Sequence, residues 1–176
     1  MDILISSNLE TLIFELTGRD SALTAERMGE LKKTGKYAID KKEREALGKI
    51  FFADYCDEEE CMEQMRESFD EYGYLCDPHT AVALKAAGVY KGAKADGNPM
   101  IVLSTASPYK FSQNVLKAIS GKALKDPFNA AEMLETLSAA PIPKQISQLK
   151  SKEKRFTKVI DKADVIKEVY GFAVKG

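Results

Sequence analysis

The sequence has few of the residues that bind metals or form disulfide frameworks. Its 176 residues contain one histidine, His79, and three cysteines without CxxC spacing. A single histidine cannot complete a histidine-rich metal site, and an odd cysteine count does not suit a disulfide scaffold. A zinc site of Cys56, Cys61, Cys76 and His79 remains formally open, but its spacing is irregular. We therefore predict no metal site and interpret the three thiols as reduced and structural.

Long apolar runs and a strong net charge are also absent. No apolar stretch approaches the length of a membrane span, and the first residues lack the basic region of a signal peptide. The net charge is -1, and no basic stripe with interleaved aromatic residues is present. These absences predict a cytoplasmic protein that binds neither membranes nor nucleic acid.

Common phosphate-binding and nucleophile motifs are missing as well. The sequence has no P-loop, no GxGxxG fingerprint, no nucleophile elbow and no convincing catalytic dyad. The residues by themselves therefore identify no catalytic group.

The most informative stretch that is present begins with the apolar run Met100–Leu103. A continuous apolar run between turn formers is typical of a strand buried on both faces of a parallel sheet. Ser107 and Pro108 then form a helix-start signal, so Ser104 and Thr105 would stand at the strand end where α/β sheets bind ligands. The alternative is that both hydroxyls only close the strand and cap the helix.

A second informative stretch surrounds the only histidine. Asp77 before Pro78 indicates a helix start, and the alanine-rich segment that follows predicts a buried helix. His79 and Thr80 would then lie at its amino-terminal end, where free N–H groups favour an anion or a polar ligand. The alternative for His79 is a hydrogen-bonded structural histidine.

Predicted helices and strands alternate along the whole chain. Capping signals at residues 40, 57 and 126 start helices. Segments 35–39, 50–55 and 156–160 read as further strands. We therefore expect an α/β fold, with a mainly parallel sheet sandwiched by helices.

Three motifs carry a resemblance to a known family. Leu103–Phe111, Asp77–Val82 and the opening Met1–Glu10 resemble the carboxyl-terminal part of threonine synthase. That family uses pyridoxal 5'-phosphate, has the tryptophan-synthase-β-like fold type II, and converts O-phospho-L-homoserine and water to L-threonine and phosphate. The resemblance implies that residues 1–176 are the carboxyl-terminal part of such an enzyme.

The resemblance also implies an incomplete cofactor site. In this fold type, the Schiff-base lysine and the glycine-rich loop for the cofactor phosphate lie in the amino-terminal part, and neither motif occurs here. We therefore expect this chain alone to be inactive, with no catalytic residue of its own, and not to bind the cofactor stably.

The resemblance assigns residues to the cofactor and, less directly, to the substrate. Thr105 matches the hydroxyl that meets the pyridine nitrogen, and Ser104 is the neighbouring alternative. His79, Thr80 and Lys110 are further candidates for contact with O-phosphohomoserine. For Lys110 the alternative is a solvated surface lysine.

Two other functions stay open at this stage. One is a free-standing, non-catalytic interaction module of the same fold, and the other is an unrelated α/β binder of small molecules. An incomplete enzyme would expose apolar surface that its missing part covers, which predicts self-association.

Overall fold

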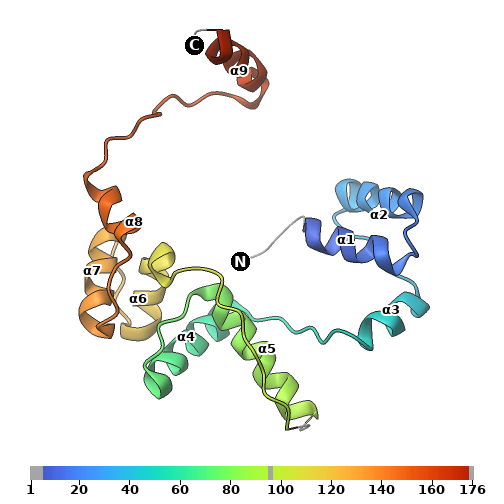
Figure 1. The fold of residues 1–176 in the computed structure, drawn as a ribbon, viewed down its shortest axis with the longest axis horizontal. Coiled ribbons are helices and arrows are strands. Elements are labelled where there is room, and N and C mark those ends of the chain that lie inside the picture. Colours follow the sequence, from blue (N-terminus) through green and yellow to red (C-terminus); the bar gives the residue numbers. More distant parts are fainter. Residues whose placement is uncertain (1–5, 95–96, 175–176) are drawn as a thin grey trace. The chain divides into compact units, whose positions relative to one another are not determined.

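The computed structural model describes residues 6–94 and 97–174 (Figure 1). The first five residues of the Met1–Glu10 motif therefore lie outside the described residues. Across the described ranges all regular structure is helical. The chain divides into two compact units, Met1–Ala140 and Pro141–Gly176. No helix in these ranges combines the length and apolar character that crossing a membrane requires.

The first unit contains two groups of packed helices. In the first group α1 packs on α2 and α3, and in the second α4 packs on α5 and α6 while α6 packs on α7. The bounds are α1 (Ser7–Leu16), α2 (Ser21–Thr34), α3 (Lys41–Gly48), α4 (Glu58–Tyr72), α5 (Pro78–Lys94), the 3-10 helix η1 (Pro108–Phe111), α6 (Ser112–Ser120) and α7 (Pro127–Ser138).

Local hydrogen bonds explain where these helices begin. The Asp40 and Asp57 side chains accept the backbone N–H groups of Glu43 and Glu60, at 2.7 Å and 2.9 Å. Each glutamate accepts the N–H of its cap in return, which completes two capping boxes. Gly73, at φ 63°, ends α4 in a left-handed conformation that suits glycine. The helix starts predicted at these two aspartates are therefore confirmed.

The main core lies where α4, α5, α6 and α7 meet. This core consists of buried apolar side chains on the facing sides of these helices. The buried residues on these helices include Met65, Ala81, Val115, Leu116, Ala130, Ala131 and Leu134.

The prediction of a mainly parallel sheet is wrong. Segments 35–39, 50–55, 100–103 and 156–160 are not helical, and none belongs to a strand in the described part of the chain. A strand is stable only when a neighbouring strand pairs its N–H and C=O groups. Residues 50–52 and 100–103 instead line the same face of α5, so their apolar side chains contact a helix.

The prediction of a buried helix after Asp77 holds only for its first turn. Thr80 and Ala81 are buried, whereas Val89 is 42 % exposed. Alanine-rich composition predicts the helix itself, but burial depends on what covers it. Beyond its first turn, α5 is covered only in part, by segments 50–52 and 100–103.

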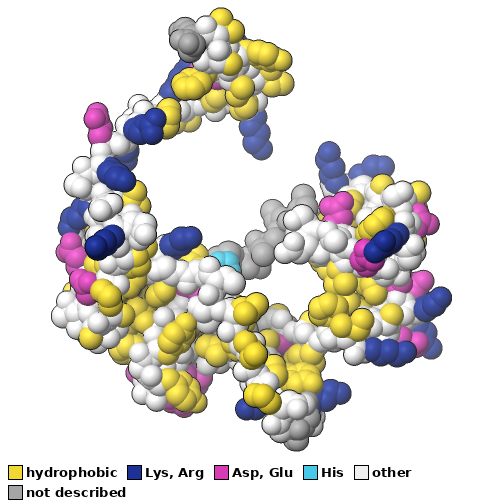
Figure 2. Space-filling view, viewed as in Figure 1, with side chains coloured by type: hydrophobic (Ala, Val, Ile, Leu, Met, Phe, Trp, Pro, Cys, Tyr) yellow, Lys and Arg dark blue, Asp and Glu magenta, His cyan; other side chains and the backbone are white. Residues whose placement is uncertain are grey.

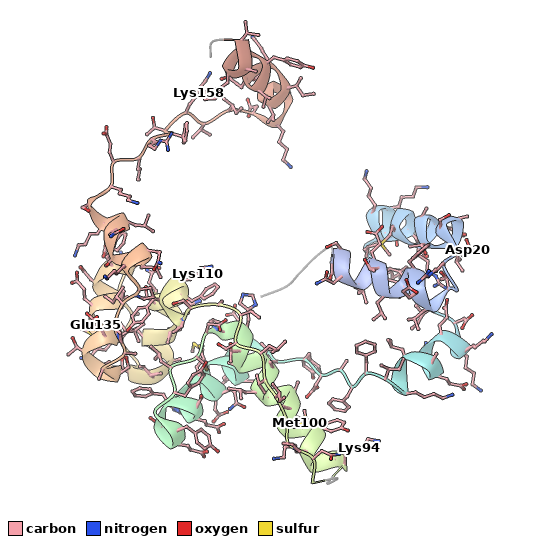
Figure 3. All side chains as sticks on the ribbon, in the orientation of Figure 1. Asp20, Lys94, Met100, Lys110, Glu135 and Lys158 are labelled. Atoms are coloured by element: carbon pink, nitrogen blue, oxygen red, sulfur yellow. The ribbon has the colours of Figure 1, made fainter. Side chains whose placement is uncertain are left out.

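An apolar groove of about 510 Å³ is lined by α5 and by segments 50–52 and 100–103. We call it the α5 groove. Phe52 packs edge-on against Tyr90, with the ring centroids 5.5 Å apart. Met100 lies near the Lys94 end of the helix (Figure 3). Hydrophobic side chains reach the molecular surface in this region (Figure 2). The lining residues are Ile50–Phe52, Ala83, Ala86, Ala87, Tyr90 and Met100–Leu103.

We expect the α5 groove to drive self-association. Ile101 is 86 % exposed and Phe51 is 51 % exposed, and contiguous apolar patches favour association. The double substitution Phe51→Lys and Ile101→Lys should shift sedimentation velocity profiles towards the monomer. Val159→Lys, in the second unit, is the matched control. A single sharp monomer peak for the unaltered chain would contradict the expectation.

The second unit is described by itself. It contains α8 (Lys144–Ser147), the 3-10 helices η2 (Gln148–Ser151) and η3 (Lys162–Asp164), and α9 (Val165–Val174). No residue of these elements is buried. The Lys158 ammonium pairs with the Glu168 carboxylate, which links the extended stretch before η3 to α9 (Figure 3).

Candidate functional site

The candidate site is built around the first turn of α5. Asp77 precedes the helix and is fully buried. Its Oδ1 accepts the backbone N–H of His79 at 2.9 Å, and its Oδ2 accepts the Thr80 hydroxyl at 2.5 Å. A carboxylate ahead of a helix satisfies a backbone N–H that the helix leaves open, here that of His79. Asp77 therefore holds Thr80 in a single orientation.

Ser104 extends this arrangement from a segment distant in the sequence. Its Oγ lies 3.2 Å from Thr80 Oγ1 and accepts the Tyr74 hydroxyl at 3.0 Å. Ser104 and Thr80 are both predicted site residues, and the structure brings these two together. Asp77 was predicted only as a helix start, and nothing local in the sequence indicates that Tyr74 contacts Ser104 across 30 residues. We call Tyr74, Ser104, Thr80 and Asp77 the hydroxyl chain.

The hydroxyl chain has one consistent direction for its protons. Each hydroxyl has a single proton to donate, and a carboxylate only accepts when ionised. Since Thr80 donates to Asp77 and Tyr74 donates to Ser104, the Ser104 proton must point at Thr80. Ser104 thus donates its one proton to Thr80 and accepts a hydrogen bond from Tyr74.

The other predicted site residues are not members of the hydroxyl chain. Thr105 follows Ser104 and is exposed, and no hydrogen bond from its side chain is present among the described residues. The His79 ring is exposed and packs edge-on against Phe111, at 5.5 Å between centroids. Lys110 is exposed in η1 and makes no ion pair with another described residue.

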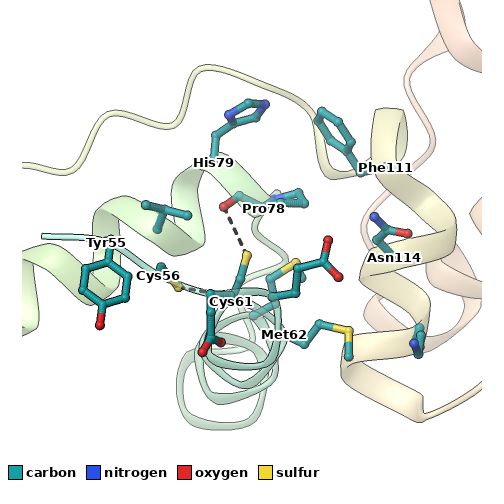
Figure 4. Close-up of a pocket in the computed structure, with 13 residues that line it drawn as sticks. Tyr55, Cys56, Cys61, Met62, Pro78, His79, Phe111 and Asn114 are labelled. Carbon is teal, nitrogen blue, oxygen red and sulfur yellow. Dashed lines mark hydrogen bonds between the residues drawn. The ribbon is translucent and has the colours of Figure 1, made fainter. Parts of the chain in front are cut away.

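A cavity of about 490 Å³ adjoins the same end of α5 (Figure 4). His79 and Phe111 lie at one side of it, and two thiols lie at the other. The Cys61 Sγ donates to the Pro78 carbonyl oxygen at 3.5 Å, which joins α4 to the start of α5. The sequence predicts structural thiols and gives no sign that two of them share a cavity.

Burial keeps these thiols protonated at neutral pH. Desolvation raises the pKa of Cys61 to about 11. It also raises the pKa of Cys56, although the nearby Lys85 ammonium opposes that shift. Lys85 lies 2.5 Å from the Glu60 carboxylate and donates to the Tyr55 carbonyl oxygen at 3.2 Å, so it ties this loop to α5.

The described residues do not assemble a metal centre. No group of three or more histidine, cysteine, aspartate or glutamate side chains in this part of the chain has the geometry for a metal ion. The zinc alternative from Cys56, Cys61, Cys76 and His79 therefore gains no support.

Comparisons with known proteins find relatives of this chain. Residues 80–169 match the family model described as "Threonine synthase, C-terminal". A threonine synthase from Pseudomonas aeruginosa is 35 % identical over 135 residues, which is 77 % of this chain and 28 % of that protein.

Two solved structures have a similar fold. The structure of threonine synthase from Brucella melitensis with bound pyridoxal phosphate is 32 % identical with a TM-score of 0.69, over 96 % of this chain and 32 % of that one. Yeast threonine synthase is 30 % identical with a TM-score of 0.71, over 99 % and 35 %. This chain spans about a third or less of the length of these relatives. Because the family model matches just over half of its residues, the chain belongs to the threonine synthase family.

Proposed function

We propose that this chain forms the ring-facing wall of a pyridoxal 5'-phosphate site. The enzyme concerned would convert O-phospho-L-homoserine and water to L-threonine and phosphate. The observation that supports the proposal is the hydroxyl chain, which anchors Ser104 and leaves Thr105 exposed beside it. Family membership supports it too, as does the relative whose structure has bound pyridoxal phosphate.

Within this proposal, Thr105 contacts the pyridine nitrogen and Ser104 positions it. The Ser104 proton is committed to Thr80, so Ser104 cannot donate to a ring nitrogen without breaking the hydroxyl chain. Thr105 has no such commitment among the described residues and can either donate or accept. Asp77 acts through Thr80 and Ser104 as a positioning residue.

The side chains present fit the ring end of this cofactor. When bound, pyridoxal phosphate supplies an electron sink for reaction at the substrate carbons. A neutral hydroxyl partner leaves the ring less electron-withdrawing than a carboxylate would. The only carboxylate of the hydroxyl chain, Asp77, is buried and faces Thr80, so it keeps its charge away from the exposed Thr105.

The same sequence does not fit the phosphate end of the cofactor. It contains no glycine-rich loop, and none of its lysines lies in the strand-end motif expected for the lysine that carries the cofactor. The proposal therefore assigns these two functions to the part of the enzyme that relatives have and this sequence does not cover. Lys110 remains a candidate for contact with the substrate phosphate, and His79 for contact with the substrate. Thr80 was a further candidate, but its hydroxyl already donates to Asp77.

The test begins with the chain alone. We expect a pyridoxal phosphate titration, followed by borohydride reduction and peptide mapping, to label no single lysine stoichiometrically, and we expect no phosphate release from O-phosphohomoserine. Addition of a family amino-terminal part that carries the lysine and the phosphate loop should restore both. Stoichiometric labelling with turnover by the chain alone would contradict the incomplete site.

The residue assignment is tested in the restored enzyme. Thr105→Val should lower turnover by about a hundredfold, because one preorganised hydrogen bond to the reacting system is lost. Thr105→Ser keeps the hydroxyl and should retain most activity. If Thr105→Val has no effect and Ser104→Ala abolishes activity, the two roles are exchanged.

A second function is favoured by the exposed α5 groove. A non-catalytic interaction module of the same fold would use that apolar surface to bind a protein partner. Failure of every amino-terminal part to restore turnover, together with a stable complex through the groove, would favour this alternative.

A further inference from the structure

Cys56 and Cys61 stand on either side of the start of α4. Asp57 is the N-cap of this helix, so Cys56 is the residue before the cap and Cys61 is the fourth residue of the helix. These are the two positions whose side chains meet in a hydrophobic staple. The Asp57 and Glu60 capping box holds the backbone between them in place.

The contacts of the two thiols agree with that arrangement. Both line the cavity beside α5, and both are partly exposed rather than sealed in the core. Each thiol also affects the pKa of the other, as close neighbours do. Their remaining contacts are weak, since Cys56 Sγ donates to the Asp57 carbonyl oxygen at 3.6 Å and Cys61 Sγ to that of Pro78 at 3.5 Å. A small oxidant can therefore approach the pair through the cavity (Figure 4).

The third cysteine provides an internal comparison. Cys76 is 1 % exposed and does not line this cavity. Its burial makes it a structural thiol, inert towards reagents that reach the other two.

We propose that Cys56 and Cys61 form a reversible intramolecular disulfide. The oxidant is a small disulfide, of which oxidised glutathione is the type. The Cys56 thiolate attacks one glutathione sulfur, the glutathione S–S bond breaks, and the first glutathione leaves as a thiolate. The Cys61 thiolate then attacks the Cys56 sulfur and releases the second. The protein loses two protons and two electrons, and both glutathione molecules become thiols.

The order of attack follows from the environments of the two sulfurs. Burial raises the pKa of both thiols, but the Lys85 ammonium opposes that shift at Cys56, so Cys56 is the better first nucleophile. Burial holds the pKa of Cys61 at about 11, so Cys61 is a poor first nucleophile. It becomes effective once the mixed disulfide places a sulfur beside it.

Disulfide formation would alter the start of α5. The Cys61 S–H group donates to the Pro78 carbonyl, and oxidation removes that proton. The lost hydrogen bond is a direct link between α4 and the helix turn that bears Thr80. The oxidised and reduced forms would therefore differ at the hydroxyl chain. This inference does not depend on the proposed cofactor.

The test is a redox titration of the full chain in glutathione buffers, followed by acid quenching, alkylation and tryptic digestion. Cys56 and Cys61 fall in one tryptic peptide, Ile50–Arg66, and Cys76 falls in the next, Glu67–Lys85. We expect the first peptide to lose both alkylations together with two hydrogen atoms. The Cys76 peptide should stay fully alkylated, and reductant should reverse the change.

Variants and denaturant separate this proposal from unspecific oxidation. Cys61→Ser should collect one glutathione on Cys56, whereas Cys56→Ser should collect far less on Cys61 in the same buffer. In urea, the pair should need about tenfold more oxidised glutathione to close, because the staple no longer holds the thiols together. The proposal would be overturned by an unchanged midpoint in urea, by disulfide-linked dimers, or by equal oxidation of all three cysteines.

Discussion

We expect Leu116→Ala to lower the free energy of unfolding of the α4, α6 and α7 bundle by about 3 kcal/mol. Leu116 lies on α6, is fully buried, and its helix packs on both α4 and α7. Truncation removes apolar burial and leaves a cavity that surrounding helices cannot fully close. Urea unfolding followed by far-ultraviolet circular dichroism measures the change.

A leucine on the surface of the same bundle provides the control. Leu137 lies on α7 and is 46 % exposed, so Leu137→Ala should cost less than about 1 kcal/mol. Equal losses for the two variants would show that the bundle does not have the core described here.

The second large effect is expected in the α1–α3 group. Arg27 on α2 donates to both carboxylate oxygens of Glu43 on α3, at 2.8 Å and 2.7 Å, and both side chains are about nine-tenths buried. Glu43→Gln removes the charge but leaves the guanidinium buried. We expect a loss of about 3 kcal/mol, because a buried charge without its partner is costly. Hydrogen exchange of peptides from α1 to α3 would measure this loss locally.

Two further variants separate burial from charge pairing. Arg19 pairs with Glu15 at 3.1 Å on the surface, where exposed pairs contribute little, so Arg19→Gln should cost less than about 1 kcal/mol. The double variant Arg27→Met and Glu43→Gln should recover much of the loss, since it removes both buried charges and keeps a side-chain oxygen to accept the Asp40 N–H. A double variant as unstable as Glu43→Gln would show that the pair contributes a net gain beyond desolvation.

The same pair predicts a pH dependence. The hydrogen bonds from Arg27 lower the pKa of Glu43 below its ordinary value of 4.5. Its stabilising effect is therefore complete above that ordinary value and is lost as the pH falls through the lower folded-state pKa. Protection of α1 to α3 should decline in that acid range for the unaltered chain, and less so for the double variant.

Helix boundaries were accessible from the sequence because they depend on neighbouring residues. Asp40 with Glu43, and Asp57 with Glu60, each close a hydrogen-bonded ring within one helical turn. Gly121 ends α6 in a left-handed conformation for the same kind of local reason. The family motifs are equally local, and they identified the family before any fold was known.

The candidate site was accessible only in part. Ser104 and Thr80 were named from their places at a predicted strand end and a helix start, and these two oxygens lie 3.2 Å apart. The Asp77 contacts with His79 and Thr80 are local to the helix start. The role of Tyr74 and the direction of the protons depend on contacts with Ser104, which is distant in the sequence. The functions assigned to Thr105, Lys110 and His79 stay predictions.

The sequence by itself determined the helix starts, the family motifs and the extended, apolar character of Met100–Leu103. Only the tertiary structure decided that this segment lies along α5 instead of in a sheet, that α5 is buried mainly at its first turn, and that two thiols share one cavity. The physical reason is the range of the interactions. A cap or a turn is satisfied within four residues, whereas a strand, a core face or a pair of side chains across a cavity needs partners that distant residues must supply.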